Sequence, residues 1–429
     1  MQVSKSVLIV LIIAVCSAAY FNTLFFNFVC DDNSLIVDNP YIRVFKFLPL
    51  FFTHDIWNIS TQAINSGYYR PLLGASFMFD YAIWHTNPLG YHLTNLIFHI
   101  LVTILVFLLV EMLFKNRIIA LSSALLFSVH PVHTEAVSFI SGRVDVLCLF
   151  FFLLSLVLFL KYFSNKRFSF YLLSLFCFFV SLLIKEMAVT LPLILLCIDY
   201  LILSQEKIKN VVKNFLRLHL GFFIILLIYF LMRYFFLGWK FMKIQTVSPV
   251  NLSYYLRILT VIRTLINYIR LLVFPYGLKF LYGPALAKSL FEPDIISGII
   301  VLSGLIILAI KSIKKYAITT FSILWFFITI LPVSNVFTNG NFFAERFLYT
   351  PSVGFCMAIG FLFYQLSKYK PKMRYLNWRK SIVFIFILLI IALGRVTFER
   401  NKVWENDFTL WYETANAQPE NATAHFLFR

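Results

Sequence analysis

Long apolar runs are the feature that narrows the choice of fold most strongly in this sequence. A helix needs roughly 17–25 apolar residues to cross a hydrocarbon layer of about 30 Å. The runs that reach or approach this length are 6–29, 92–113, 118–130, 145–163, 168–184, 188–203, 219–237, 295–311, 317–333, 351–367 and 381–396. Only 13% of the 429 residues are charged, against about 25% in a typical soluble domain. The sequence therefore predicts an all-α polytopic membrane protein with about eleven transmembrane helices.

The first apolar run resembles a secretory signal peptide, because Lys5 precedes an apolar stretch and several small residues. Its apolar character continues to Val29, however, which is long enough to span a bilayer. We therefore expect an uncleaved first transmembrane helix.

Basic residues gather in alternate connections and so orient the chain. With the N-terminus inside, the inner connections contain Lys and Arg at 115–117, 161–167, 207–217, 311–315 and 368–380, in agreement with the positive-inside rule. This alternation of inner and outer connections requires that the run 256–274 does not cross the membrane. We expect it to stay on the outer face, as a surface helix or re-entrant piece whose arginines reach lipid head groups or a ligand. The prediction is N-in and C-out. The net charge of +18 then reflects topology rather than a nucleic-acid surface.

In this arrangement all but three of the 19 Asp and Glu residues fall outside or near the outer boundary. Two long outer segments, 30–91 and 238–294, interleave aromatic and aliphatic residues with Pro, Gly, Asn and a few charges. That composition favours short helices lying in the interface. We predict a membrane domain over 1–396 and an outer tail over 397–429, with any chemistry on the outer face.

Two adjacent aspartates, Asp31 and Asp32, close the first apolar run. One carboxylate would suffice to end a helix in water, whereas a pair raises the pKa of one member and leaves the other ionised. A solvated helix end is the alternative interpretation. Arg70, further along the same outer loop, is a candidate for substrate binding.

Further polar side chains gather in the second outer loop, "SVHPVHTEAVSFISGRVD". His130, His133 and Glu135 loosely imitate metal ligands. Because a clear third ligand is missing, histidines that pack or form hydrogen bonds are favoured over a metal site. Arg143 and Asp145 either contribute to substrate binding or pair with each other.

Two more junctions place charges at outer helix ends: Lys185 with Glu186, and Glu345 with Arg346. Ionisable groups at a membrane edge are functional candidates, because their desolvation must be offset by a ligand or partner. Local neutralisation is the alternative. Carboxylates beside arginines suit transfer from an anionic lipid carrier, since a base can activate a hydroxyl while the planar guanidinium holds a phosphate.

Three stretches, "YRPLLGASFMFDYAIWHTNPLGYHLTNLIFHILVT", "SVHPVHTEAVSFISGRVDVLCLFFFLLSL" and "ERFLYTPSVGF", resemble the transmembrane and tetratricopeptide-repeat (TMTC) family. That family belongs to the GT-C glycosyltransferases, alongside the protein O-mannosyltransferases, and the likeness runs from about 30 to 425. The resemblance implies a GT-C-like fold and transfer of a monosaccharide such as mannose from a polyprenyl-phosphate donor to a hydroxyl of an acceptor protein. The reaction would take place on a periplasmic, extracellular or ER-lumenal side, with membrane lipid and no nucleic acid as partner.

In GT-C enzymes an acid just after the first helix acts as general base, and the resemblance transfers this role to Asp31 or Asp32. Glu135 matches the acidic position of the second loop, which is associated with the donor–acceptor site. Arg143 and Arg346 are inferred donor-phosphate contacts. Some GT-C enzymes need a divalent ion such as Mg or Mn and others do not, so a metal cofactor stays open.

The tail "NKVWENDFTLWYETANAQPENATAHFLFR" resembles the approach to a tetratricopeptide array and stops inside the first repeat. A lone helical hairpin cannot bury its own apolar face, so we expect the start of a truncated repeat region. Two alternative functions remain. One is a lipid-linked-sugar transporter or flippase, which would place charges along the bundle interior. The other is a membrane-anchored repeat scaffold without catalysis.

Overall fold

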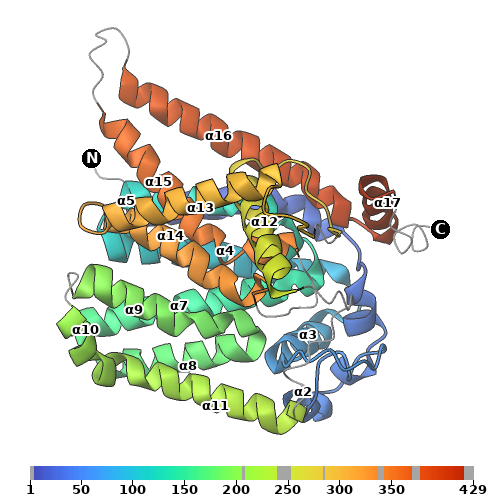
Figure 1. Cartoon of the computed structure of the whole chain (residues 1–429). Helices are drawn as coiled ribbons and strands as arrows, with labels where there is room; N and C mark the ends of the chain where they lie inside the picture. Colours follow the sequence, from blue (N-terminus) through green and yellow to red (C-terminus); the bar gives the residue numbers. More distant parts are fainter. Residues whose placement is uncertain are drawn as a thin grey trace.

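The computed structural model of the chain describes residues 4–204, 208–238, 253–283, 286–336, 343–369 and 377–419. Within these residues the chain is helical, with short 3-10 and π segments between the longer helices and no strand. The axes of most long helices lie roughly parallel to one another (Figure 1). The chain begins at one end of this bundle, and its last described helix lies at the other (Figure 1).

Each apolar run predicted to span contains a helix. The helices are α1 (Lys5–Tyr20), α4 (Pro88–Phe114), α5 (Arg117–Val129), α7 (Arg143–Asn165), α8 (Phe168–Ile184), α9 (Leu191–Ile198), α11 (Leu220–Leu237), α13 (Pro293–Ser312), α14 (Ala317–Ile330), α15 (Ser352–Lys368) and α16 (Trp378–Asn401). Among the described residues, seven segments are long and apolar enough to cross a membrane, and three shorter apolar helices accompany them. The chain is therefore an all-α, multi-pass integral membrane protein.

Local sequence signals explain where several helices begin and end. The Asn87 side chain accepts a hydrogen bond from the N–H of Leu89 at 3.2 Å, and Asn116 caps α5 in the same way. Such side chains satisfy N–H groups that lack a partner in the first helical turn. α4 and α7 both end at a lysine in the left-handed conformation, Lys115 with φ 53° and Lys166 with φ 57°, a common helix ending.

Glycines allow α15 to pack closely against two other helices. A Cβ added at Gly360 would lie 2.5 Å from the Ser123 hydroxyl of α5, and one at Gly354 would lie 2.5 Å from the Ser322 carbonyl of α14. Close packing of small residues is a main source of helix association in a lipid environment. It holds α15 firmly and thereby fixes the segment that precedes it, which contains Glu345 and Arg346.

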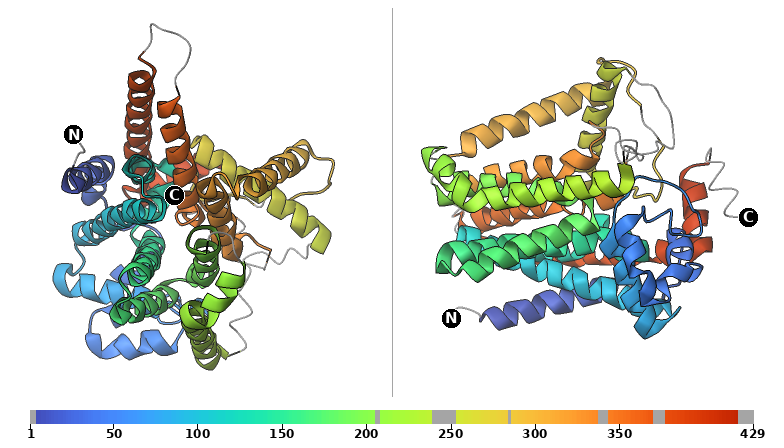
Figure 2. Two further views of the ribbon diagram at one scale, coloured as in Figure 1. Left: turned by 90° about the vertical axis from the view of Figure 1, so that its left-hand side faces the viewer. Right: turned by 90° about the horizontal axis from the view of Figure 1, so that it is seen from below.

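Three short helices gather at one end of the bundle, as predicted for the outer loops: α2 (Leu48–Thr53), α3 (Pro71–Trp84) and α17 (Asp407–Ala417). The longer helix α12 (Tyr254–Val273) lies toward the same end. α12 is steeply inclined to α13 in two views (Figures 1 and 2). α12 is not among the described segments that are long and apolar enough to cross a membrane. That the run 256–274 lies on the outer face stays a prediction.

One expectation for α12 needs correction. The sequence predicts that its arginines reach lipid head groups or a ligand, and for Arg263 this prediction is wrong. Instead, Arg263 forms ion pairs with Glu292 and, at 2.5 Å, with Asp294. These two acids precede or begin α13, so Arg263 attaches α12 to the helix that follows it.

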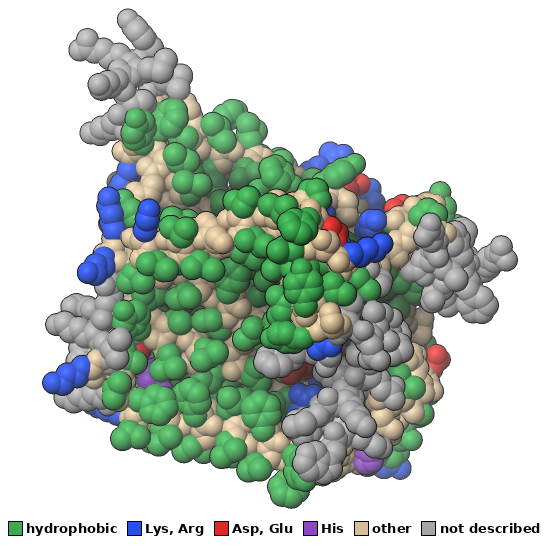
Figure 3. All heavy atoms as spheres, viewed as in Figure 1, with side chains coloured by type: hydrophobic (Ala, Val, Ile, Leu, Met, Phe, Trp, Pro, Cys, Tyr) green, Lys and Arg blue, Asp and Glu red, His purple; other side chains and the backbone are tan. Residues whose placement is uncertain are grey.

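The surface separates apolar from charged side chains. Hydrophobic side chains cover the flank of the bundle seen in Figure 3, Lys and Arg lie at both its left and right ends, and the visible Asp and Glu lie mostly toward the right. The right end is the one that contains α3 and α17. Part of the predicted tail, 420–429, lies outside the described residues.

Candidate active site

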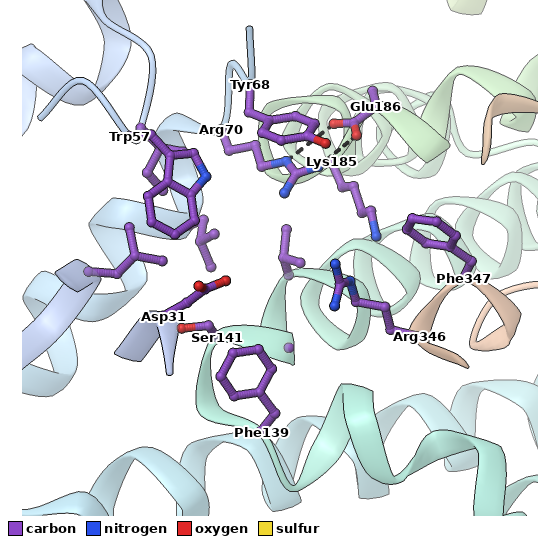
Figure 4. A pocket seen from close by; sticks show the side chains of 15 residues that line it. Asp31, Trp57, Tyr68, Arg70, Phe139, Ser141, Lys185, Glu186, Arg346 and Phe347 are labelled. Carbon is purple, nitrogen blue, oxygen red and sulfur yellow. Dashed lines mark hydrogen bonds and ion pairs between the residues drawn. The ribbon is translucent and has the colours of Figure 1, made fainter. Parts of the chain in front are cut away.

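A cavity of about 150 Å³ lies at the end of the bundle that contains α3 (Figure 4). Segments far apart in the sequence form its wall: the first outer loop, the start of α3, the turn before α7, the junction after α8 and the segment before α15. Its charged lining residues are Asp31, Arg70, Lys185, Glu186 and Arg346. The structure thus brings together five of the residues predicted as a site.

The two adjacent aspartates have different environments. Asp31 lines the cavity and points into it (Figure 4). Of the two carboxylates in the described cavity lining, Glu186 is held by Arg70, whereas Asp31 accepts a weak hydrogen bond from the Cys30 thiol at 3.6 Å. Burial raises the pKa of Asp31 above its ordinary value of 3.8, although the nearby Arg346 guanidinium works against this rise. Asp31 is therefore placed to accept a proton from a molecule in the cavity.

Asp32 is fully buried behind the cavity wall. One of its oxygens accepts hydrogen bonds from the N–H of Ser141 at 2.8 Å and from the Ser141 hydroxyl, and the other accepts from the N–H of Val29 at 3.1 Å. Burial raises its pKa to about 7, against the lowering effect of these donors. Asp32 therefore joins the first outer loop to the turn before α7. The structure thus gives different surroundings to the two aspartates, which the sequence left as alternatives for the base.

Three cations from three different segments reach the cavity, and each is held by a carboxylate. Arg70 binds Glu186 through two hydrogen bonds, at 2.6 and 3.2 Å. Lys185 contacts Asp145 at 2.6 Å, with both side chains almost completely buried. Such pairing fixes long side chains in one geometry before any ligand arrives.

Glu135 holds the third cation, Arg346. One Glu135 oxygen accepts a hydrogen bond from the backbone N–H of Arg346 at 2.8 Å, and the other pairs with its guanidinium. Glu135 is only 1% exposed, whereas the Arg346 side chain is 23% exposed. The sequence assigns Glu135 a catalytic role, but the structure places it behind Arg346 as the group that positions this arginine.

Arg143 lies elsewhere than predicted. Its guanidinium is buried, contacts Asp80 of α3 at 2.5 Å and donates to the Asn95 side chain at 2.9 Å. It therefore pairs neither with Asp145, the alternative in the sequence analysis, nor with a group in the cavity lining. Arg143 connects α3 and α4 to the start of α7.

The two histidines of the second outer loop are buried packing groups. His130 contacts the Leu272 carbonyl at 2.9 Å, and His133 lies between the Phe127 carbonyl at 2.9 Å and the Ser352 hydroxyl at 2.8 Å. Within the described ranges, no group of three or more His, Cys, Asp or Glu side chains lies close enough to hold a metal ion.

Glu345 belongs to a neighbouring buried cluster. Its carboxylate accepts hydrogen bonds from the N–H of Lys279 and from the Tyr282 hydroxyl, both at 2.5 Å, and Arg400 lies 3.8 Å away. Burial raises its pKa to about 7 against the effect of Arg400. Glu345 joins the segment after α12 to the end of α16, so it supports the outer end rather than facing the cavity.

The chain is similar in sequence to known mannosyltransferases. Residues 70–233 match the family model of the dolichyl-phosphate-mannose-protein mannosyltransferases. The chain is 31% identical over 431 residues to the protein O-mannosyl-transferase F38B6.6 of Caenorhabditis elegans. The alignment covers 97% of this chain and 59% of that protein. It is 28% identical over 466 residues to the protein O-mannosyl-transferase TMTC3 of Homo sapiens, covering 96% and 48% respectively. The chain is thus similar, over nearly its whole length, to these protein O-mannosyl-transferases.

The chain spans about half to three fifths of the length of those two relatives. Its fold is similar to the crystal structure of the Archaeoglobus fulgidus oligosaccharyltransferase tethered with an acceptor peptide. The TM-score is 0.50 at 12% identity, and the match covers 98% of this chain and 58% of that chain. The likeness shows that the two proteins share a similar fold.

Three residues that line the cavity or support the segments around it were not predicted from the sequence. Asp80 was not singled out, although an acid in an otherwise apolar helix needs a buried partner and so carried a signal. Tyr68 lies 4.1 Å from the Arg70 guanidinium and lines the cavity. Ser141, which binds Asp32, gave no signal in the sequence, because serines are common in turns for many reasons.

Proposed function

We propose that the chain is a membrane glycosyltransferase that moves a monosaccharide, mannose in the first instance, from a polyprenyl-phosphate donor to a hydroxyl of an acceptor protein. One observation carries the proposal. A single cavity contains the Asp31 carboxylate, which is not held by a cation of the described lining, together with three cations already fixed by Glu186, Asp145 and Glu135. The relatives named above support the choice of mannose and of a protein acceptor.

The proposed chemistry uses these side chains in two roles. The acceptor oxygen attacks the anomeric carbon of the sugar, Asp31 takes the hydroxyl proton, and the bond between the sugar and the donor phosphate breaks. The electron pair of that bond leaves with the phosphate. Arg346, with Lys185 and Arg70, stabilises the charge that develops there, because fixed donors in a water-poor site are most effective where charge appears.

We also propose how the chain sits in its membrane. The eleven helix-containing runs would cross it, with the N-terminus inside and the cavity outside, on a periplasmic, extracellular or lumenal face. Residues 1–396 would form the transferase domain, and the tail from 397 would lead toward a repeat region. The positive-inside pattern supports this orientation.

The direct test is transfer by the purified chain. With a radiolabelled polyprenyl-phosphate mannose and peptides rich in Ser and Thr, we expect labelled peptide. Arg346→Ala is expected to weaken donor binding about 10- to 100-fold, the loss typical of a hydrogen bond to a charged group of ~1.5–3 kcal/mol. Donor-dependent thermal stabilisation in detergent measures that binding without relying on turnover.

Arg395→Ala is a matched control, because Arg395 is 77% exposed on α16. It should leave donor binding and transfer unchanged. A wild-type chain that binds no donor and transfers no sugar would contradict the proposal and return the scaffold alternative.

The pH dependence of transfer is expected to follow Asp31. A general base must be ionised, and the pKa of Asp31 is raised above 3.8. Activity should therefore be lost as the pH falls through that raised pKa and regained as the pH rises, with the midpoint above 3.8. A rate profile between pH 4 and 8 measures this limb. A flat profile down to pH 4 would argue against Asp31 as base.

A further inference from the structure

The C-terminal segment of the described chain lies directly over the loop that carries Asp31. The N–H of Asn27 donates to the Glu405 carbonyl at 2.9 Å, and the Asn22 side chain donates to the Phe398 carbonyl at 2.8 Å. Asn401 donates to the Ala19 carbonyl at 2.9 Å. Residues nearly 400 positions apart are thus held together at the outer end of α1.

Asp407, the first residue of α17, makes the contacts closest to the proposed base. One of its oxygens accepts a hydrogen bond from the backbone N–H of Cys30 at 2.7 Å, and the other accepts from the Asn33 side chain at 3.0 Å. These two donors flank Asp31 and Asp32 in the sequence. A single carboxylate therefore binds the turn of residues 30–33 at both of its ends, before and after the aspartate pair.

This turn contains an unusual backbone conformation. Cys30 has φ 51°, in the left-handed region, and a residue other than glycine persists there only when its surroundings hold it. The Asp407 carboxylate supplies such a constraint through the Cys30 N–H on one side, and Asp32 supplies another through Ser141. Between the two anchors, Asp31 is left facing the cavity.

Aromatic side chains also connect the C-terminal segment to the cavity wall. Trp404 is fully buried and stacks on Phe139, with ring centroids 5.0 Å apart and an interplanar angle of 17°. Phe139 lines the cavity. Beside it, the Ser138 hydroxyl donates to the Asn401 side chain at 2.9 Å. The C-terminal segment thus supports two sides of the site: the turn with Asp31 and the wall with Phe139.

We propose that Asp407 is a positioning residue for Asp31, so that the C-terminal segment is part of the active site. This inference rests on the proposed transferase function. Asp407 has a simpler role as well, because an acid in the first turn of a helix favours that helix. That role alone would leave the turn at Cys30 and the proton transfer by Asp31 undisturbed.

The test compares Asp407→Ala with the conservative Asp407→Asn, which keeps one acceptor oxygen. Asp407→Ala is expected to lower kcat 10- to 100-fold at an unchanged KM for the donor, and Asp407→Asn should recover part of this loss. Glu413→Gln, an exposed acid on the same helix, is the matched control and should behave as wild type.

Cys30 provides a readout that does not depend on turnover. It is the one cysteine of the chain outside the long apolar helices, and it is half-buried. Alkylation by a maleimide, followed by mass spectrometry of the Cys30 peptide, should be several-fold faster in Asp407→Ala than in wild type or Glu413→Gln. Asp407→Asn should be intermediate.

Unchanged kcat and unchanged alkylation in Asp407→Ala would overturn the inference, as would a lower kcat with unchanged alkylation. If Asp407→Ala does not fold, the same comparison between Asp407→Asn and wild type decides. A wild-type chain without transfer would instead refute the proposed function. In that case alkylation of Cys30 still reports whether Asp407 holds the turn.

Discussion

Asp31→Asn is expected to lower the rate of sugar transfer about 10²- to 10⁴-fold, the usual contribution of a positioned general base. Asparagine has nearly the same shape but cannot take the acceptor proton, so donor binding should stay close to wild type. The measurement is kcat with saturating donor, together with donor-dependent thermal stabilisation. Because Asp31 lines the cavity and is not part of a buried network, the variant should also fold normally.

Two neighbouring acids serve as controls for Asp31→Asn. Asp38→Asn changes an exposed carboxylate seven residues further along and should have no effect. Asp32→Asn should act mainly on stability, at a cost of about 1–3 kcal/mol, because it disturbs buried hydrogen bonds to Ser141 and Val29. Full transfer by Asp31→Asn, with loss of transfer in a correctly folded Asp32→Asn, would reverse the assignment.

Arg143→Met is expected to destabilise the folded chain by about 3–5 kcal/mol, because it leaves the buried Asp80 carboxylate without its cation. The guanidinium also donates to the Asn95 side chain and to the Tyr91 carbonyl, so the loss spreads to α4. Thermal unfolding in detergent measures the effect. Donor binding per folded molecule should change little.

The double variant Arg143→Met with Asp80→Asn is the matched partner of this test. It removes the uncompensated charge and keeps an oxygen for the Thr94 hydroxyl, which contacts Asp80 at 2.9 Å. Part of the lost stability should return. If the Arg143→Met variant were stable but no longer bound donor, the result would instead support the prediction from the sequence that Arg143 contacts the donor phosphate.

Hydropathy predicted the bundle well, because each run of apolar residues must satisfy its backbone hydrogen bonds internally in lipid. The positive-inside count predicted that the run 256–274 does not cross the membrane, and α12 is not among the described segments that are long and apolar enough to do so. It could not predict the partner of Arg263. Ion pairs between separate helices depend on packing geometry that periodicity does not contain.

The site was predicted as a set of residues but not as a set of roles. Asp31 and Asp32 are indistinguishable in sequence, and a partner 109 positions away, Ser141, decides which of them faces the cavity. Arg143 and Asp145 looked like a local pair. They lie two residues apart at the start of α7, however, so their side chains point in different directions. Arg143 pairs with Asp80 of α3, and Asp145 pairs with Lys185 in the junction after α8.

The matching of every cavity cation with its own acid has a consequence for the course of the proposed reaction. The donor is a phosphodiester with one negative charge, and the product phosphate carries two. Meanwhile the proton taken from the acceptor neutralises Asp31. The paired cations and acids add no net charge, so the total charge of the cavity with its donor and acceptor is the same before and after the bond breaks. No counterion then has to enter or leave the cavity during the chemical step.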